Sequence, residues 1–267
     1  FEEQLFQGDS LATNILGTKS SVRKMTRSDV METYKKLYRP SRLVVSYVGG
    51  VDLETITSFA EKYFGQNTEK EQDTIAKNPF VPRGTNFNIV KNKKTHQAHC
   101  VLGSYAPALS SELKFAASLL TNILGGPSFN ALLNLKLREE QGLTYNIEAN
   151  YTAYSDTGVF AVYFGTDYSK VPLCRQIIDD LFQSVIEKGF EEQQLAAYKQ
   201  QILGQLAVSD DNYMSLMLNN AKSFWWYGHV DSFQEVAQKI NAISNDEIKT
   251  VAKQILSPEK INVLIYK

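Results

Sequence analysis

The chain has 267 residues, with 28 Lys and Arg against 29 Asp and Glu, so its formal net charge is −1. Phosphate recognition needs a basic surface, and this balance therefore argues against a nucleic-acid-binding protein. Hydrophobic residues make up 43% of the chain, and Gly and Pro number only 15 and 7, which excludes collagen-like and low-complexity classes and allows one or two ordinary cores.

The first predicted elements belong to an internal repeat. Thr26–Tyr47 aligns with Ser244–Ile265, and every pair keeps the same offset of 218 residues without gaps. Each copy reads as a capped amphipathic helix, a Pro that stops it, and a short β-branched strand. A chance likeness between two helix–Pro–strand segments is the alternative. The aligned pairs include Asp29 with Glu247, Val30 with Ile248, Pro40 with Pro258 and Val45 with Val263.

The repeat predicts a duplicated protein whose first copy is truncated. The second copy ends the chain, so a first unit of the same length would begin well before the first residue. The polar stretch 66–78, followed by two prolines, is typical of a linker. We therefore predict that residues 1–75 are the closing part of a first domain and that residues 76–267 are a complete second domain.

The second domain shows strands and helices in blocks. An α+β fold with a mixed, largely antiparallel sheet is therefore expected, because strict βαβ alternation is missing. The aromatic cluster at 224–227 is expected in a core. The predicted elements are strands at 86–90 and 97–105 around a solvated basic hairpin turn, helices at 113–124 and from 129 to a stop at Gly142, an alternating strand at 143–153, a second hairpin strand at 159–165, and a helix from Pro172 to Gly189.

Two features bear on membranes and compartment. Residues 115–135 carry no charge and are long enough to span a bilayer, but Gly125-Gly126-Pro127-Ser128 at their centre predicts two soluble helices joined by a tight turn. Cys100 and Cys174 form no C-x-x-C pair and lie in apolar patterns, so we expect buried thiols. The unpaired thiols favour a reducing cytoplasm. The chain begins with Phe rather than Met, so a targeting segment would lie upstream.

The common catalytic motifs are missing from the sequence. His96 and His99 are three residues apart in a strand pattern, which sends their side chains to opposite faces, and His229 is isolated. Neither H-E-x-x-H nor H-x-x-E-H occurs, and there is no G-x-S-x-G or phosphate-binding loop. We therefore expect no zinc site made by this chain alone and no nucleophilic triad.

One constellation lies within residues 124–145, which read LGGPSFNALLNLKLREEQGLTY. A helix ends just after Arg138, the chain turns at Gly142, and Tyr145 follows at the start of the alternating strand. Ordinary structural roles are available for both side chains. The arginine would complement the helix dipole or pair with Glu139, Glu140 or a Glu elsewhere, and the tyrosine would lie on the apolar face of its strand, in the core.

These motifs resemble the second homologous domain of the inverted zinc peptidases, the family of pitrilysin, insulin-degrading enzyme and mitochondrial processing peptidase. The resemblance covers essentially the whole chain. In the second domain it rests on Leu124-Gly125-Gly126, Leu137-Arg138-Glu139, Gly142-Leu143-Thr144-Tyr145, and Ser155-Asp156-Thr157-Gly158 to Phe164-Gly165-Thr166. The closing third of the family's first domain is matched by Leu16-Gly17-Thr18, Tyr38-Arg39-Pro40 and Val48-Gly49-Gly50-Val51-Asp52.

The resemblance implies a clamshell of two similar domains that face each other across a peptide-sized chamber. The family's first domain carries H-x-x-E-H and a later Glu ligand, so zinc in the full-length enzyme would be bound upstream of residue 1 and not by this chain. The second domain contributes an Arg and a Tyr, which carry over to Arg138 and Tyr145 as the catalytic residues. Where close relatives have Ser-Arg, this chain has Ala131-Leu132, so the preceding loop would contact substrate differently.

On this basis the chain is expected to be the substrate-binding and transition-state-stabilising C-terminal portion of a zinc metalloendopeptidase, inactive alone. The alternative is a non-catalytic companion or scaffold subunit of the same fold. The expected partners are a peptide substrate and either the missing N-terminal domain or a homologous zinc-bearing subunit, with a homodimer also possible. Neither nucleic acid nor a membrane is expected.

Overall fold

The computed structural model describes residues 1–65, 80–81 and 86–267, so the predicted linker at 66–78 lies outside the described residues. The chain forms two compact units. The sheet unit comprises Phe1–Thr13, Lys77–Ile202 and Ala237–Lys267, and the helical unit comprises Asn14–Ala76 and Leu203–Val236. Each unit therefore combines segments from both sides of the predicted domain boundary, which itself stays a prediction.

A five-stranded mixed sheet organises the sheet unit, and the fold is α+β as expected. The strand order is β1-β5-β2-β4-β3, in which β1 and β5 are parallel and every other neighbouring pair is antiparallel. The strands are β1 (Asn88–Lys91), β2 (Ala98–Ala106), β3 (Ile147–Ala153), β4 (Gly158–Thr166) and β5 (Asn262–Tyr266).

The hairpin predicted between the first two strands is wrong. The C-terminal strand β5 lies between β1 and β2, with Leu264 opposite both Ile89 and Val101. The basic turn is held by the chain's C-terminal residue, because the backbone N–H groups of Lys93 and Lys94 both donate to the carbonyl oxygen of Lys267. Local alternation could not reveal this strand, since its sequence lies more than 150 residues away.

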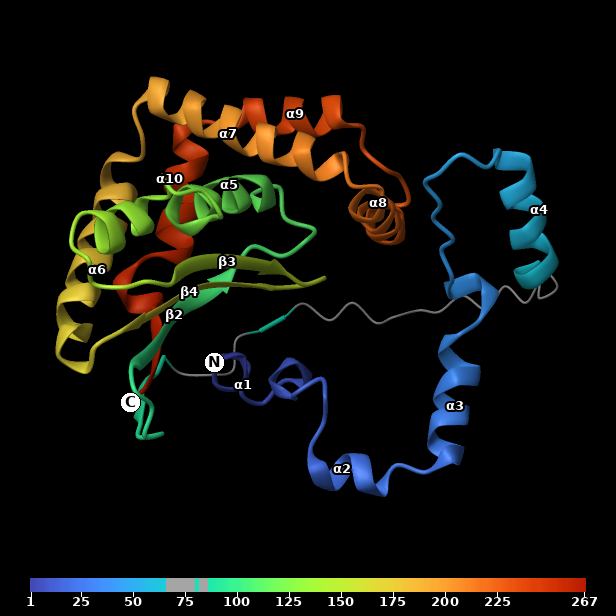
Figure 1. The fold of residues 1–267 in the computed structure, drawn as a ribbon, viewed down its shortest axis with the longest axis horizontal. Coiled ribbons are helices and arrows are strands. Elements are labelled where there is room, and N and C mark those ends of the chain that lie inside the picture. The colour runs from blue at the N-terminus through green and yellow to red at the C-terminus, as the bar shows by residue number, and fades with distance from the viewer. Residues whose placement is uncertain (66–79, 82–85) are drawn as a thin grey trace. The chain divides into compact units, whose positions relative to one another are not determined.

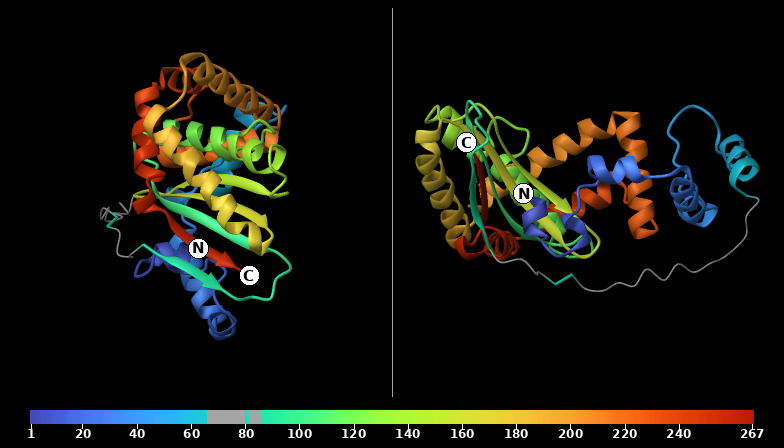
Figure 2. Two further views of the ribbon diagram at one scale, coloured as in Figure 1. Left: turned by 90° about the vertical axis from the view of Figure 1, so that its left-hand side faces the viewer. Right: turned by 90° about the horizontal axis from the view of Figure 1, so that it is seen from below.

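Three helices cover one face of the sheet and enclose the main core (Figures 1 and 2). They are α5 (Lys114–Gly125), α6 (Val171–Lys188) and α10 (Asn245–Ile255). Pro172 in the first turn and Gly189, with φ of 64°, delimit α6 as predicted. A capping box between Ser244 and Glu247 starts α10. The buried residues on these helices include Ala117, Leu120, Leu124, Ile178, Phe182, Ile248 and Ile255.

A second, smaller apolar cluster lies on the opposite face of the sheet. The N-terminal helix α1 (Glu2–Leu5) is seated there (Figure 1), and Leu5 and Phe6 are only 2% and 1% exposed. The Phe6 ring packs edge-on against Tyr105 and Tyr154, with ring centroids 5.7 and 6.0 Å apart. A segment that precedes the predicted linker therefore covers one face of the second domain's sheet.

The remaining helices lie wholly or partly in the helical unit. Here α3 repeats the start of α10, because Thr26 and Asp29 form a capping box at the positions aligned with Ser244 and Glu247. The helices are α2 (Lys19–Lys24), α3 (Arg27–Leu37), α4 (Leu53–Phe64), α7 (Glu192–Asp210), α8 (Tyr213–Tyr227) and α9 (Phe233–Ala242). In the part of the chain that the structure describes, no helix has the length and apolarity needed to cross a bilayer.

The aromatic cluster at the end of α8 is not in a core, contrary to expectation. Phe224, Trp225 and Trp226 are about half exposed, at 51%, 52% and 50%. All four residues at 224–227 are exposed, so an apolar pattern that normally marks a core here marks an open surface.

Candidate functional site

A groove of about 310 Å³ lies at the edge of the sheet, where β3 is the last strand. The end of α5, the loop after it, a short π-helix and the first part of β3 form its walls. The lining residues are Gly125, Gly126, Pro127, Ser128, Phe129, Asn134, Arg138, Asn146, Ile147, Glu148, Ala149 and Asn150. Seven residues of the predicted constellation at 124–145, Arg138 among them, thus line one cavity.

The glycine pair at the end of α5 allows helix and strand to approach closely. A methyl group on Gly125 would lie 2.6 Å from the backbone nitrogen of Ala149 and 2.7 Å from its Cβ. At Gly126 it would lie 2.7 Å from the carbonyl oxygen of Asn122. Only glycine fits without displacement at such distances, which explains this part of the motif.

Arg138 is carried by the π-helix Asn134–Glu139. The N–H of Glu140 donates to the carbonyl of Leu135 at 2.9 Å, a bond across five residues that is typical of a π-helix. The sequence pattern did not predict this wider turn. A turn at residues 140–141 follows the helix, and Gly142 comes after it with a φ of 59°, which is the left-handed conformation expected of a glycine at such a stop. The guanidinium Nε lies 3.5 Å from Glu139 Oε1, and the side chain is 42% exposed. Arg138 is therefore a groove residue whose charge solvent can reach.

Tyr145 does not lie in the core, although its strand pattern predicted that. Its side chain is 89% exposed, and β3 begins only at Ile147. The preceding residue explains the difference, because the buried Thr144 hydroxyl lies 2.6 Å from the carbonyl oxygen of Gly165 and 2.9 Å from that of Asn146. With Thr144 turned inward, its neighbour Tyr145 is directed into solvent.

The structure places Arg138 in the groove lining, and Tyr145 is not among the residues that line it. The two residues flank the short connection that begins at Gly142 and is anchored by Thr144. The backbone N–H of Leu143 donates to the carbonyl of Leu137 at 2.8 Å, and the Thr166 hydroxyl donates to the carbonyl of Leu143 at 2.6 Å. This connection is consequently fixed to both the helix and the sheet.

The edge strand also offers backbone groups to the groove. The N–H of Gly165 donates to the carbonyl of Asn146 at 3.2 Å, so these two residues form a hydrogen-bonded pair. Along β3, hydrogen-bonded and non-hydrogen-bonded pairs with β4 then alternate. In an antiparallel pair this alternation turns the backbone groups of Ile147 and Ala149 away from β4. Both residues line the groove.

Sequence reasoning missed several groove residues. Asn146, Glu148 and Asn150 are the polar positions of the alternating pattern, which was interpreted only as the solvent face of a half-buried strand. Phe129 is 78% exposed beside them, and the Asn134 amide donates to its carbonyl at 2.7 Å. Asn134, which follows the glycine-rich loop, also lines the groove, but nothing in the sequence placed it beside Asn146 and Asn150.

The three histidines do not form a metal site. His96 is exposed in the turn before β2, and His99 Nδ1 lies 2.8 Å from the Tyr163 hydroxyl on the sheet. Among the described residues, no group of three His, Cys, Asp or Glu is placed to hold a metal ion. The residues that the structure describes therefore offer no ligand set that fits a zinc ion.

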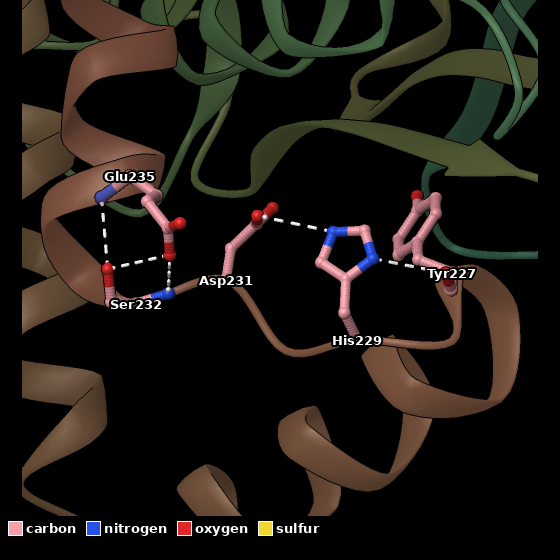
Figure 3. A network of polar contacts seen from close by, with 5 residues as sticks. All are labelled: Tyr227, His229, Asp231, Ser232 and Glu235. Carbon is pink, nitrogen blue, oxygen red and sulfur yellow. Dashed lines mark hydrogen bonds and ion pairs between the residues drawn. The ribbon is translucent and has the colours of Figure 1, made fainter.

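His229 has acidic and hydroxyl neighbours, but their contacts are structural (Figure 3). Its Nε2 lies 3.4 Å from Asp231, and its Nδ1 lies 3.1 Å from the carbonyl oxygen of Tyr227. The Ser232 backbone N–H instead donates to Glu235 Oε2 at 2.7 Å, and the N–H of Glu235 donates to the Ser232 hydroxyl at 3.3 Å, which is a capping box at the start of α9. The network shapes the turn between α8 and α9.

Both cysteines are buried and free, as expected. Burial raises the pKa of the Cys100 thiol to about 11, with a further contribution from Cys174. The pKa of Cys174 is also raised by burial. Neither thiol is therefore in the activated, low-pKa state that a nucleophile requires.

Comparison with known proteins identifies the family. Residues 24–202 match the family described as the peptidase M16 inactive domain. The chain belongs to the peptidase M16 family. The resemblance recognised from the motifs is thereby confirmed.

Individual M16 relatives agree with this assignment. The chain is 25% identical over 256 residues to a zinc protease, YmxG, of Bacillus subtilis, covering 96% of this chain and 61% of the relative. The fold matches an M16 inactive-domain structure from Pseudomonas fluorescens, with a TM-score of 0.86, 16% identity, and coverage of 99% of this chain and 63% of that one. A chain of the Candida albicans complex III2 matches with a TM-score of 0.84 and 19% identity, over 99% of this chain and 64% of that one. This chain thus spans about three fifths of the length of such proteins.

Proposed function

We propose that this chain is the substrate-binding and transition-state-stabilising C-terminal portion of a zinc-dependent metalloendopeptidase. The groove at the free edge of β3, with Arg138 in its lining, is the observation that carries this proposal. The chamber would be completed by a preceding zinc-bearing domain or by a homologous subunit, and this chain alone would be inactive. The buried free thiols support a reducing, cytoplasmic location.

The geometry of the edge strand supports peptide binding. An extended peptide would lie along β3 and exchange hydrogen bonds with the backbone of Ile147 and Ala149, as an added strand does. The Arg138 guanidinium has donors in a planar fork, which suits substrate carbonyl groups. Phe129 at the groove would contact an apolar side chain of the peptide.

Transition-state stabilisation would come from Tyr145. Its phenol is exposed next to a connection that is anchored at Thr144, so it can reach a substrate held outside the sheet. A phenolic hydroxyl donates a hydrogen bond to a developing oxyanion without carrying charge. Zinc bound by the preceding domain would supply the activated water.

Photocrosslinking tests the groove directly. In the complete protein, benzoylphenylalanine replaces Phe129, and a peptide substrate is added before irradiation. We expect peptide attached at position 129 and displaced by excess unlabelled peptide. The matched control carries the same group at Leu173, an exposed position on α6. Equal attachment at both positions would contradict peptide binding in the groove.

A companion or scaffold subunit is the second candidate, and the match to a chain of complex III2 favours it. The two candidates differ upstream. A peptidase needs H-x-x-E-H in the preceding domain or in a partner subunit, whereas a scaffold does not. Hydrolysis of peptides by the complete protein, abolished by a chelator and restored by zinc, would support the peptidase.

A further inference from the structure

The edge strand β3 presents two different faces beside the groove. Ile147 and Ala149 pack on the side of α5, α6 and α10, in the main core. Because side chains alternate along a strand, Glu148 and Asn150 lie on the outer face of the sheet, away from these helices, and both are exposed. All four residues line the groove. A peptide added to β3 would therefore have one row of side chains on the core side and the next on the side of Glu148.

The carboxylate of Glu148 is available to a ligand. Among the described residues that line the groove, Glu148 alone is acidic. It pairs with Tyr163 on β4, but the Tyr163 hydroxyl lies 2.8 Å from His99 Nδ1 on β2, so it is turned away from β3. In the part of the chain that the structure describes, no hydrogen bond or ion pair reaches the Glu148 carboxylate.

The outer face is also open at this end of β3. The helix α1 and its apolar cluster cover Val159, which pairs with Thr152 near the other end of the strand. Glu148 lies towards the start of β3, beyond this cluster, and is exposed. Within the described part of the sheet unit, a side chain placed beside Glu148 would thus meet no covering helix.

The core side of the groove has the opposite character. Arg138 comes from the π-helix, whose Leu137 is buried in the main core, and Phe129 comes from the loop after α5. Both side chains line the groove, and both are exposed. A basic peptide side chain would be repelled by Arg138 on this side, whereas an apolar one would contact Phe129. The two faces of β3 therefore favour different residues.

The backbone geometry brings Glu148 close to an added strand. The backbone groups of Ile147 and Ala149 point away from β4, so they would bond to the peptide. In an antiparallel arrangement Glu148 would then occupy a non-hydrogen-bonded position of the new ladder, where opposed side chains come closest. Cβ atoms of directly opposed residues lie about 4.5–5.5 Å apart, which allows an ion pair between them.

We propose that Glu148 is a specificity-determining residue that selects a lysine or arginine of the bound peptide. The basic residue faces Glu148 on the outer face, and its neighbours in the peptide are apolar and face Phe129 and Arg138 on the core side. The preferred substrates are thus extended peptides in which basic and apolar residues alternate. This inference rests on the proposed function, because it requires a peptide that adds to β3 in the groove.

Competition for the groove tests this selection. In the complete protein with benzoylphenylalanine at position 129, light attaches a labelled peptide, and unlabelled peptides of the length of β3 compete with it. One competitor alternates lysine and leucine, the other alternates glutamine and leucine, and both are blocked at their ends. We expect the lysine peptide to compete at a roughly two- to fivefold lower concentration, as a cross-strand ion pair provides.

Substitutions of Glu148 identify the residue responsible. Glu148→Gln keeps the size of the side chain and removes its charge, so the preference for the lysine peptide should disappear. Glu148→Lys should reverse the preference, because like charges would then oppose each other. Glu187→Lys, at an exposed position of α6 outside the groove lining, changes the net charge equally and should leave the preference intact. A preference that survives both Glu148 substitutions, or that Glu187→Lys also removes, would overturn the proposal.

The order of residues in the peptide gives a second measurement. A peptide of the same composition with its lysines in adjacent pairs would place some of them beside Arg138, so it should compete less well than the alternating peptide. Equal competition by the two peptides would contradict selection by two faces. Displacement by the glutamine peptide reports on groove binding alone, so an unchanged preference in the Glu148 variants would sink this inference and leave the proposed function standing. If no peptide attaches at position 129, both fail.

Discussion

Gly125 and Ala149 approach each other so closely that a methyl group on the glycine would lie 2.6 Å from the alanine nitrogen. This contact joins the end of α5 to the edge strand, and both residues line the groove. Gly125→Ala should destabilise the protein by about 1–3 kcal/mol, because backbone rather than a flexible side chain blocks the added methyl. Chemical denaturation measures the loss.

Gly204→Ala is the matched control for that prediction. Gly204 lies within α7 and would have open space around a Cβ. The substitution should leave stability unchanged or raise it by roughly 0.5–1 kcal/mol, since alanine favours the helix. Equal losses in both variants would show that the Gly125 contact is not specific.

Thr144 controls the direction of Tyr145. Thr144→Val removes the buried hydroxyl and leaves the carbonyl groups of Gly165 and Asn146 without it. We expect a loss of about 1–3 kcal/mol in unfolding free energy. Thr152→Val, at an exposed position of β3, should cost much less. The idea fails if the two variants melt at the same temperature.

Stability should also depend on pH at the alkaline end through Cys100. Its pKa is about 11 in the folded protein against an ordinary 9.0, so the folded state holds this proton more tightly. Below pH 9 the thiol is protonated in both the folded and the unfolded state, so it adds nothing to the pH dependence of the unfolding free energy. As the pH rises from about 9 towards 11, the unfolding free energy should fall. Cys100→Ala should remove part of that slope in melting curves recorded across the range. An unchanged slope would place the alkaline sensitivity in other groups.

Local patterns predicted most of the elements near the groove. The span of α6 follows from Pro172 and Gly189, and the β3–β4 hairpin follows from alternation and the Ser155–Gly158 turn. These features depend on residues close in sequence, where backbone preferences act directly.

Features that depend on distant segments could not be predicted. The position of β5 between β1 and β2 is set by pairing across the chain, and the exposure of Tyr145 is set by Thr144 bonding to Gly165. The groove itself unites the π-helix, the glycine loop and β3. Arg138 was predicted as a site residue because it belongs to a family motif. Asn146 and Glu148 belong to no such motif, and only the structure identifies them as groove residues.

Tyr145→Phe separates catalysis from packing, because only the hydroxyl is removed from an exposed ring. In the complete zinc-loaded enzyme, kcat should fall by on the order of 10²–10³, as for the loss of an oxyanion donor. KM should change less, and the melting temperature should stay near normal. Steady-state kinetics with a zinc measurement on the same sample check this, and full activity would exclude the role.

The most direct measurement is kcat/KM for peptide hydrolysis by the complete enzyme carrying Arg138→Ala, with Glu139→Ala as its neighbour control. Arg138 lines the groove and Glu139 does not, although the two side chains are 3.5 Å apart. Peptide binding in the groove predicts a fall in kcat/KM for Arg138→Ala comparable to that of Tyr145→Phe, with little change for Glu139→Ala. Wild-type kcat/KM in the Arg138→Ala enzyme, with its zinc content intact, would contradict the proposed site.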